Sequence, residues 1–109
     1  MREDYSVRLV RVEEIICAVA RDKRVFALEK TSELRTYYTL SQLETMLPTD
    51  RFLRVHDSCI ANLEMAEELL FLGGHSYALR LSNGRQLPVG RARYGELRRR
   101  LGLESEVSS

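Results

Sequence analysis

Apolar and polar residues alternate in short segments through the first third of the chain. This two-residue period is that of a half-buried β-strand rather than of a helix. The strands expected from the pattern cover residues 5–12, 15–20, 25–28 and 34–39. Charged or polar residues fill the stretches 21–24 and 29–33, which are short enough to be turns. Because strands joined by short turns usually pair with their neighbours in sequence, the pattern predicts an antiparallel meander.

A helical period replaces the alternation at residues 41–47, where apolar residues recur three and four positions apart. Ser41 and Glu44 have the spacing of a capping box, and Pro48 cannot continue a helix. We therefore expect a helix of about two turns, which needs packing against the sheet to be stable.

Residues 52–63 contain two apolar-alternating segments that meet at the polar residues His56, Asp57 and Ser58. This interruption favours a strand broken by a bulge or corner over a continuous helix. The next segment, 64–72, has a helical composition but precedes two glycines, so we expect a turn or short helix and then a strand from residue 68.

The last third of the chain predicts a hairpin and a closing helix. Residues 77–81 alternate and 86–89 return, with the hairpin signal Asn83-Gly84 between them. Pro88 cannot donate to a ladder, so the returning strand should lie at a sheet edge. Residues 90–101 carry one apolar stripe, formed by Tyr94, Leu97 and Leu101, and are expected to form a helix.

The length of 109 residues and the composition, 44% apolar and 30% charged, indicate a single globular domain with a tail at residues 104–109. No apolar run approaches the roughly 20 residues of a membrane span, and the first residues lack a secretion signal, so we expect a cytoplasmic protein. Cys17 and Cys59 lie in apolar surroundings without metal-ligand spacing, which predicts small buried side chains in a reducing compartment and no metal or cofactor.

Charge is unevenly distributed along the chain. Residues 51–100 hold nine arginines and five acids, whereas residues 1–50 hold eight basic and nine acidic residues. The guanidinium fork of arginine suits phosphates and guanine edges, although a genome-wide arginine preference would give the same pattern.

Three interpretations of the segment around His56 compete. A catalytic triad is disfavoured, because neighbouring positions of an extended chain point to opposite faces and no nucleophile, phosphate-loop or metal motif is present, so we expect no enzyme. In a structural interpretation His56 and Ser58 satisfy backbone groups, and Asn62 caps a turn. In a binding interpretation, cationic loops at 21–24, 56–58 and 90–93 form one surface, provided that the fold gathers them.

The order of the motifs resembles the LytTR family of DNA-binding domains. The motifs are the run RVHDSCIAN from Arg54 to Asn62, then a strand with an Asn-Gly turn, then LPVGR from Leu87 to Arg91 before a short helix. The likeness covers residues 5–103. It implies a mainly β domain of about ten short strands in three small antiparallel sheets, with short helices that include a C-terminal one.

The resemblance further implies a transcriptional regulator whose loops enter successive major grooves of duplex DNA. Such domains bind direct or inverted repeats in pairs on the DNA. This pairing is compatible with a monomer in free solution. The DNA-binding positions expected from the resemblance and from the cationic loops are Arg21, Lys23, Arg24, His56, Asp57, Gly90, Arg91 and Arg93.

Two positions depart from the family pattern. Asp57 stands where Arg or Asn is usual, and Gly90 replaces a serine. A carboxylate is repelled by phosphate unless it accepts a hydrogen bond, for example from a cytosine amino group. The alternative function is therefore a module of the same fold that binds a protein partner rather than DNA.

Overall fold

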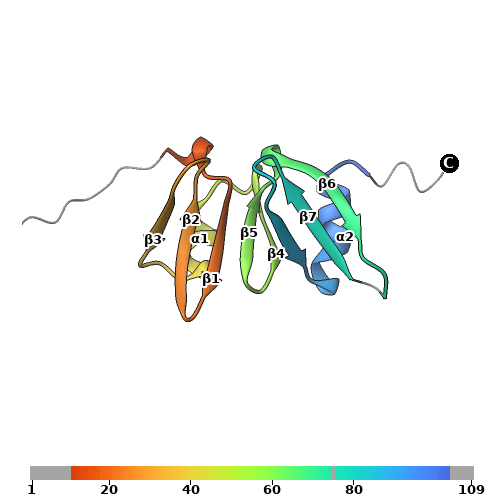
Figure 1. Cartoon of the computed structure of the whole chain (residues 1–109), viewed down its shortest axis with the longest axis horizontal. Coiled ribbons are helices and arrows are strands. Elements are labelled where there is room, and N and C mark those ends of the chain that lie inside the picture. The colour runs from red at the N-terminus through yellow and green to blue at the C-terminus, as the bar shows by residue number, and fades with distance from the viewer. Residues whose placement is uncertain (1–10, 75, 104–109) are drawn as a thin grey trace, which may run out of the picture.

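The computed structural model of the protein describes residues 11–74 and 76–103. In this part of the chain, eight strands form two antiparallel sheets, accompanied by two α-helices and two single-turn 3-10 helices (Figure 1). The expected mainly β class with short helices and a C-terminal helix is confirmed. The expected counts of ten strands and three sheets are wrong, because the described residues form eight strands in two sheets. The strand expected at 5–12 and the tail at 104–109 fall almost wholly outside the described residues, and Val12 already begins a 3-10 helix, Val12–Glu14.

The larger sheet has five strands in the order β3-β2-β1-β5-β4. Their bounds are Cys17–Arg21 for β1, Arg24–Leu28 for β2, Glu33–Thr36 for β3, Phe52–His56 for β4 and Cys59–Asn62 for β5. The predicted meander is confirmed for β1, β2 and β3. The two apolar segments around residue 57 are not one broken strand, because the chain reverses between β4 and β5 and the two strands pair with each other.

The smaller sheet has three strands in the order β6-β7-β8. They are β6 (Ala66–Phe71), β7 (Tyr77–Leu81) and β8 (Gln86–Val89). The hairpin expected at Asn83-Gly84 is confirmed, and Gly84 takes the positive φ of +85° that favours glycine in such a turn. Pro88 lies in an edge strand, as expected.

The helices begin close to the predicted residues. Helix α1 spans Leu40–Met46 and α2 spans Arg91–Arg100, while a second 3-10 helix, Leu63–Met65, precedes β6. The capping box of α1 differs from the prediction, since it joins Thr39 and Gln42 instead of Ser41 and Glu44. Both pairs have the same sequence spacing, and only the exact start of the helix distinguishes them.

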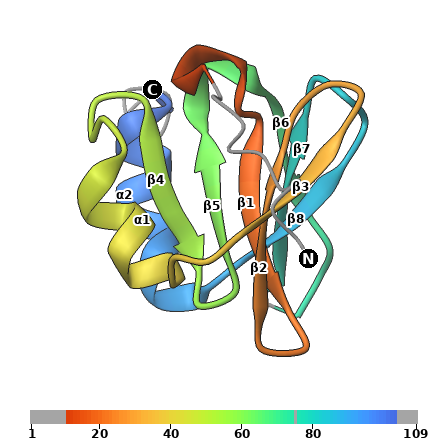
Figure 2. The ribbon, with the colours of Figure 1, turned by 90° about the vertical axis from the view of Figure 1, so that its left-hand side faces the viewer.

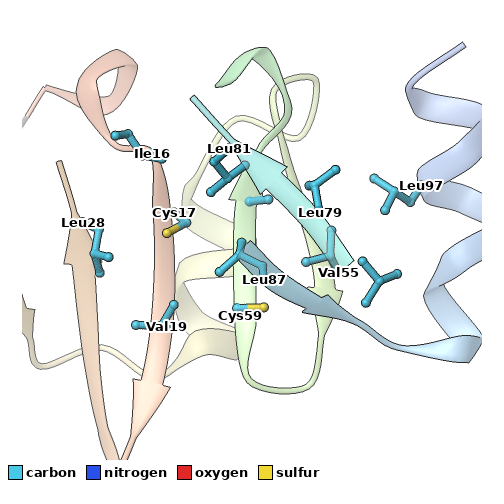
Figure 3. Packing of buried hydrophobic residues seen from close by; sticks show 12 residues of the cluster. Ile16, Cys17, Val19, Leu28, Val55, Cys59, Leu79, Leu81, Leu87 and Leu97 are labelled. Atoms are coloured by element: carbon cyan, nitrogen blue, oxygen red, sulfur yellow. The ribbon is translucent and has the colours of Figure 1, made fainter. Parts of the chain in front are cut away.

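Two hydrophobic cores lie on opposite faces of the five-stranded sheet. The larger core fills the space between the two sheets and α2, and Figure 3 shows side chains of both sheets gathered there with Leu97 of α2. Its buried members are Ile16, Cys17, Val19, Leu28, Val55, Cys59, Ala61, Leu79, Leu81, Leu87, Val89 and Leu97. The smaller core packs α1 against the other face of the sheet and includes Ala18, Leu43 and Ile60.

Strand β5 contributes to both cores, because all four of its residues are buried. Cys59 and Ala61 point into the larger core and Ile60 into the smaller one. Asn62 ends the strand as the only buried polar residue of the described chain. Its side chain donates to the Ile15 carbonyl at 2.9 Å and accepts from the Glu64 N–H at 3.0 Å, so its polar atoms are satisfied, in agreement with the structural role expected for it.

Candidate nucleic-acid interface

The three loops that the sequence predicted to be cationic lie at one edge of the molecule, although the β4-β5 turn itself presents the carboxylate of Asp57. The β1-β2 turn, the β4-β5 turn and the junction of β8 with α2 share the lower edge in two perpendicular views (Figures 1 and 2). Hydrogen bonds join them, because the Ala20 N–H donates to the Ser58 carbonyl at 2.9 Å and the Gly90 N–H donates to the Val55 carbonyl at 2.7 Å. The fold therefore gathers the three loops on one side of the molecule, as the binding interpretation requires. We call this side of the molecule the loop edge.

The β1-β2 turn is as short as a hairpin loop can be. Asp22 and Lys23 occupy its two central positions with φ of 51° and 65°, the left-handed values of a type I′ turn. Lys23 and Arg24 are exposed, and no carboxylate of the described residues lies within 4 Å of either cation. Arg21 differs from them, because it forms an ion pair with Glu33. Two of the three predicted cations of this turn are therefore free to meet an anion.

Arg21 also lies with its guanidinium carbon 4.6 Å from the centre of the Phe26 ring. Together with the Glu33 ion pair, this contact holds the arginine on the surface of the sheet. Its charge is already compensated, so it is the weakest of the predicted contacts in this turn.

The β4-β5 turn presents the Asp57 carboxylate, while the half-buried His56 bonds within the turn. The Nδ1 atom of His56 accepts the Ser58 N–H at 3.1 Å and lies 2.8 Å from the Ser58 hydroxyl. His56 therefore shapes the turn, as the structural interpretation expected. The Asp57 carboxylate is 91% exposed and contacts Arg93 at 3.5 Å, so the residues His56, Asp57 and Ser58 do not have the geometry of a triad.

Arg54 holds the backbone of this turn and was not among the predicted site residues. Its guanidinium donates to the His56 carbonyl at 3.2 Å and to the Asp57 carbonyl at 2.7 Å. A third nitrogen contacts the Glu44 carboxylate of α1 at 3.1 Å. The sequence places Arg54 in the middle of an expected strand, where a charged side chain normally needs a partner. This was the feature of the sequence that indicated a supporting role for Arg54.

The β8-α2 junction places Arg91 at the start of a ten-residue helix. Arg91 is exposed, and no described carboxylate pairs with it. Gly90 is the N-cap with an extended backbone, and an added Cβ would lie 3.8 Å from the Val55 carbonyl oxygen, an ordinary contact. A helix start with an adjacent free arginine suits a phosphate or a base edge.

The eight predicted site residues thus divide into two groups. Lys23, Arg24 and Arg91 of the loop edge pair with no carboxylate in the described part of the chain, and Gly90 precedes Arg91. Arg21, His56, Asp57 and Arg93 lie at the same edge but have partners within the protein.

The potential metal ligands and the two thiols of the described residues were compared with the sequence expectations. Residues 11–74 and 76–103 contain no group of three or more potential metal-ligating side chains among His, Cys, Asp and Glu. Burial raises the pKa of Cys17 to about 11 and that of Cys59 to about 12, so both remain unreactive thiols near neutral pH.

No helix in the described part of the chain is long and apolar enough to cross a membrane.

Comparison with known proteins gives the same family from sequence and from structure. Residues 5–102 match the family model of the LytTr DNA-binding domain. The sensory transduction protein LytR of Streptococcus mutans is 30% identical over 100 residues, covering 92% of this chain and 41% of the relative. The sensory transduction protein LytT of Bacillus cereus is 33% identical over 100 residues, covering 92% and 41%.

A solved structure agrees with these sequence matches. The LytTr DNA-binding domain of a putative methyl-accepting/DNA response regulator from Bacillus cereus superposes with a TM-score of 0.79 at 26% identity, and the alignment covers 85% of each chain. The present chain spans about two fifths of the length of the curated relatives.

Proposed function

We propose that this chain, which belongs to the LytTr DNA-binding domain family, binds specific duplex DNA sites as part of a bacterial transcriptional regulator. The loops of the loop edge enter successive major grooves at repeated half-sites, and two copies bind as a pair. The proposed DNA binding takes place in the cytoplasm and involves no catalysis. The observation that carries the proposal is that Lys23, Arg24 and Arg91 belong to loops of one edge and that no carboxylate of the described residues lies within 4 Å of them.

Each loop has a proposed role. Lys23 and Arg24 neutralise backbone phosphates, which contributes affinity without reading sequence. Arg91 donates to a guanine edge or anchors a phosphate, because its guanidinium pairs with no carboxylate of the described residues. Asp57 accepts a hydrogen bond from a cytosine amino group, and Arg93 orients its carboxylate from a distance of 3.5 Å.

The substitution Arg91→Ala tests the role of the free arginine. We expect specific binding to weaken by about 1 to 3 kcal/mol in a gel shift on a duplex selected from a random pool, with an unchanged circular dichroism spectrum. Arg85→Ala is the matched control, because Arg85 is an exposed arginine of the β7-β8 turn at the opposite edge (Figure 1). Equal affinities of the two variants would show that Arg91 does not contact the DNA.

The substitution Asp57→Asn tests the base-discriminating carboxylate. Removing this charge also releases Arg93, so we expect tighter binding to random duplex DNA and a steeper salt dependence. Fluorescence anisotropy at two salt concentrations measures both quantities. If neither changes, the carboxylate lies away from the DNA. A wild-type protein without salt-sensitive DNA binding at micromolar concentration would instead favour a protein partner.

A further inference from the structure

We propose that a groove beside the β1-β2 turn is a second contact with the DNA backbone, which takes a phosphate flanking the bases reached by the loops. This inference rests on the proposed function and extends its footprint towards β3. The groove is lined by Lys23 and Arg24 of the turn, by Arg35 of β3, by Tyr37 and Tyr38 of the link to α1, and by Asp57. From the sequence, residues 35–38 were expected only to form part of a strand.

The groove has an excess of positive charge that residues 11–74 and 76–103 do not compensate. Lys23, Arg24 and Arg35 are all exposed, and the part of the chain that the structure describes has no carboxylate within 4 Å of them. Its only acidic lining residue, Asp57, pairs with Arg93. A site with three free cations and one carboxylate attracts a phosphate.

The aromatic side chains of the groove support a ligand contact. Tyr37 is 85% exposed, which is unusual for a large ring and gives it no role in either core. The guanidinium carbon of Arg35 lies 4.8 Å from the centre of this ring. Stacking on an aromatic face limits the freedom of the guanidinium before any ligand arrives, so less entropy is lost when it binds a phosphate oxygen. The Tyr37 hydroxyl is a second available donor.

The position of the groove places it beside DNA that is seated on the loops. In both views the link from β3 to α1 lies in the lower half of the molecule, above the tip of the β1-β2 turn (Figures 1 and 2). The groove shares Lys23 and Arg24 with the first loop and Asp57 with the second. A duplex that contacts these two loops therefore has its backbone next to Arg35 and Tyr37.

The salt dependence of binding to a random-sequence duplex tests this contact. One lost phosphate contact lowers the slope of log affinity against log salt by about 0.9, so the loss of affinity between 50 and 200 mM salt becomes about 3.5-fold smaller. We expect this change for Arg35→Ala and not for the control Arg85→Ala. For Tyr37→Phe we expect weaker binding with the slope unchanged, because only a neutral donor is removed.

The outcomes separate this inference from the proposed function. Equal slopes for Arg35→Ala and Arg85→Ala, or an unchanged slope for Arg35→Ala, overturn the groove contact. If Arg91→Ala loses specific binding while Arg35→Ala binds as the wild type does, only the groove contact fails. If the wild type shows no salt-sensitive binding, both proposals fail together. Hydroxyl-radical footprinting on a selected duplex should show protection lost on one flank for Arg35→Ala.

Discussion

Arg54 is the residue on which the shape of the β4-β5 turn depends, and its removal should destabilise the domain measurably. Its side chain is only 14% exposed, and it reaches two consecutive backbone carbonyls of the turn and a carboxylate of α1. The substitution Arg54→Ala removes all of these contacts at once. Arg54→Lys keeps the charge but cannot reproduce the fork that reaches two carbonyls.

The expected loss follows from the surroundings of each contact. The bond to the His56 carbonyl is partly buried and comes from a charged donor, so it contributes about 1.5 kcal/mol. The Asp57 carbonyl is exposed and can be hydrated after the substitution, which reduces its share to about 1 kcal/mol. The Glu44 carboxylate is 46% exposed, so this ion pair adds about 0.5 kcal/mol. We expect Arg54→Ala to lower the free energy of unfolding by about 3 kcal/mol.

Thermal and chemical unfolding followed by circular dichroism measure this loss. For a domain of this size, 3 kcal/mol corresponds to a fall in Tm of about 12 to 24 °C. The matched control is again Arg85→Ala, for which the change should stay within about 0.5 kcal/mol. Arg54→Lys should fall between the two variants. DNA affinity should decrease in the same order at a temperature where all variants are folded, because the turn that carries Asp57 loses its fixed shape.

Two results would refute this reasoning. A loss below about 1 kcal/mol for Arg54→Ala would show that water replaces the guanidinium at both carbonyls. Equal stability of Arg54→Lys and the wild type would show that the fork geometry is unimportant. Faster hydrogen exchange at the Ser58 amide in Arg54→Ala should accompany the expected outcome.

Further predictions concern the buried polar and thiol groups. Asn62→Ala should lower the free energy of unfolding by about 2 to 3 kcal/mol in urea, since it orphans the Ile15 carbonyl and the Glu64 N–H. Burial keeps Cys17 and Cys59 protonated in the folded state, with pKa values of about 11 and about 12, whereas thiols of the unfolded chain ionise near pH 9. Stability should thus be unaffected by these thiols below pH 9 and fall above it, by at most about 1.4 kcal/mol per pH unit and thiol.

Control variants distinguish these effects from general changes. Asn83→Ala removes the oxygen that accepts the Arg85 N–H at 3.0 Å in an exposed turn and should cost less than Asn62→Ala. The double variant Cys17→Ala, Cys59→Ala should flatten the alkaline part of the stability profile. An identical slope in the double variant would assign the pH dependence to other groups.

Local signals in the sequence predicted the elements well. The Asn83-Gly84 hairpin needs only its own residues to form, and Pro88 at a sheet edge follows from a missing N–H. The burial of Cys17 and Cys59 followed from their apolar neighbours. These features depend on contacts within a few residues, which a single sequence displays directly.

Contacts between distant segments could not be predicted in the same way. The pairing of Cys17 with Ala61 determines which strands share a sheet, and no local pattern records it. Arg54 and Arg35 were missed for a related reason, because their roles depend on α1 and on the first turn, which only the fold brings near. The resemblance to a known family indicated the loops of the proposed interface, but not the residues that support or flank them.

The central position of β5 has a consequence for the folding rate. Its pairing with β1 joins residues 17 and 61, so 44 positions of chain separate two partners of the same ladder. The entropy of closing this loop must be overcome before either core can be completed, since β5 supplies side chains to both. We therefore expect folding in milliseconds to seconds, the range of domains dominated by non-local strand pairing, rather than in the microseconds of helical bundles. Substitutions in β5 should slow folding more than substitutions in the β6-β7-β8 sheet, whose hairpins form from neighbouring residues.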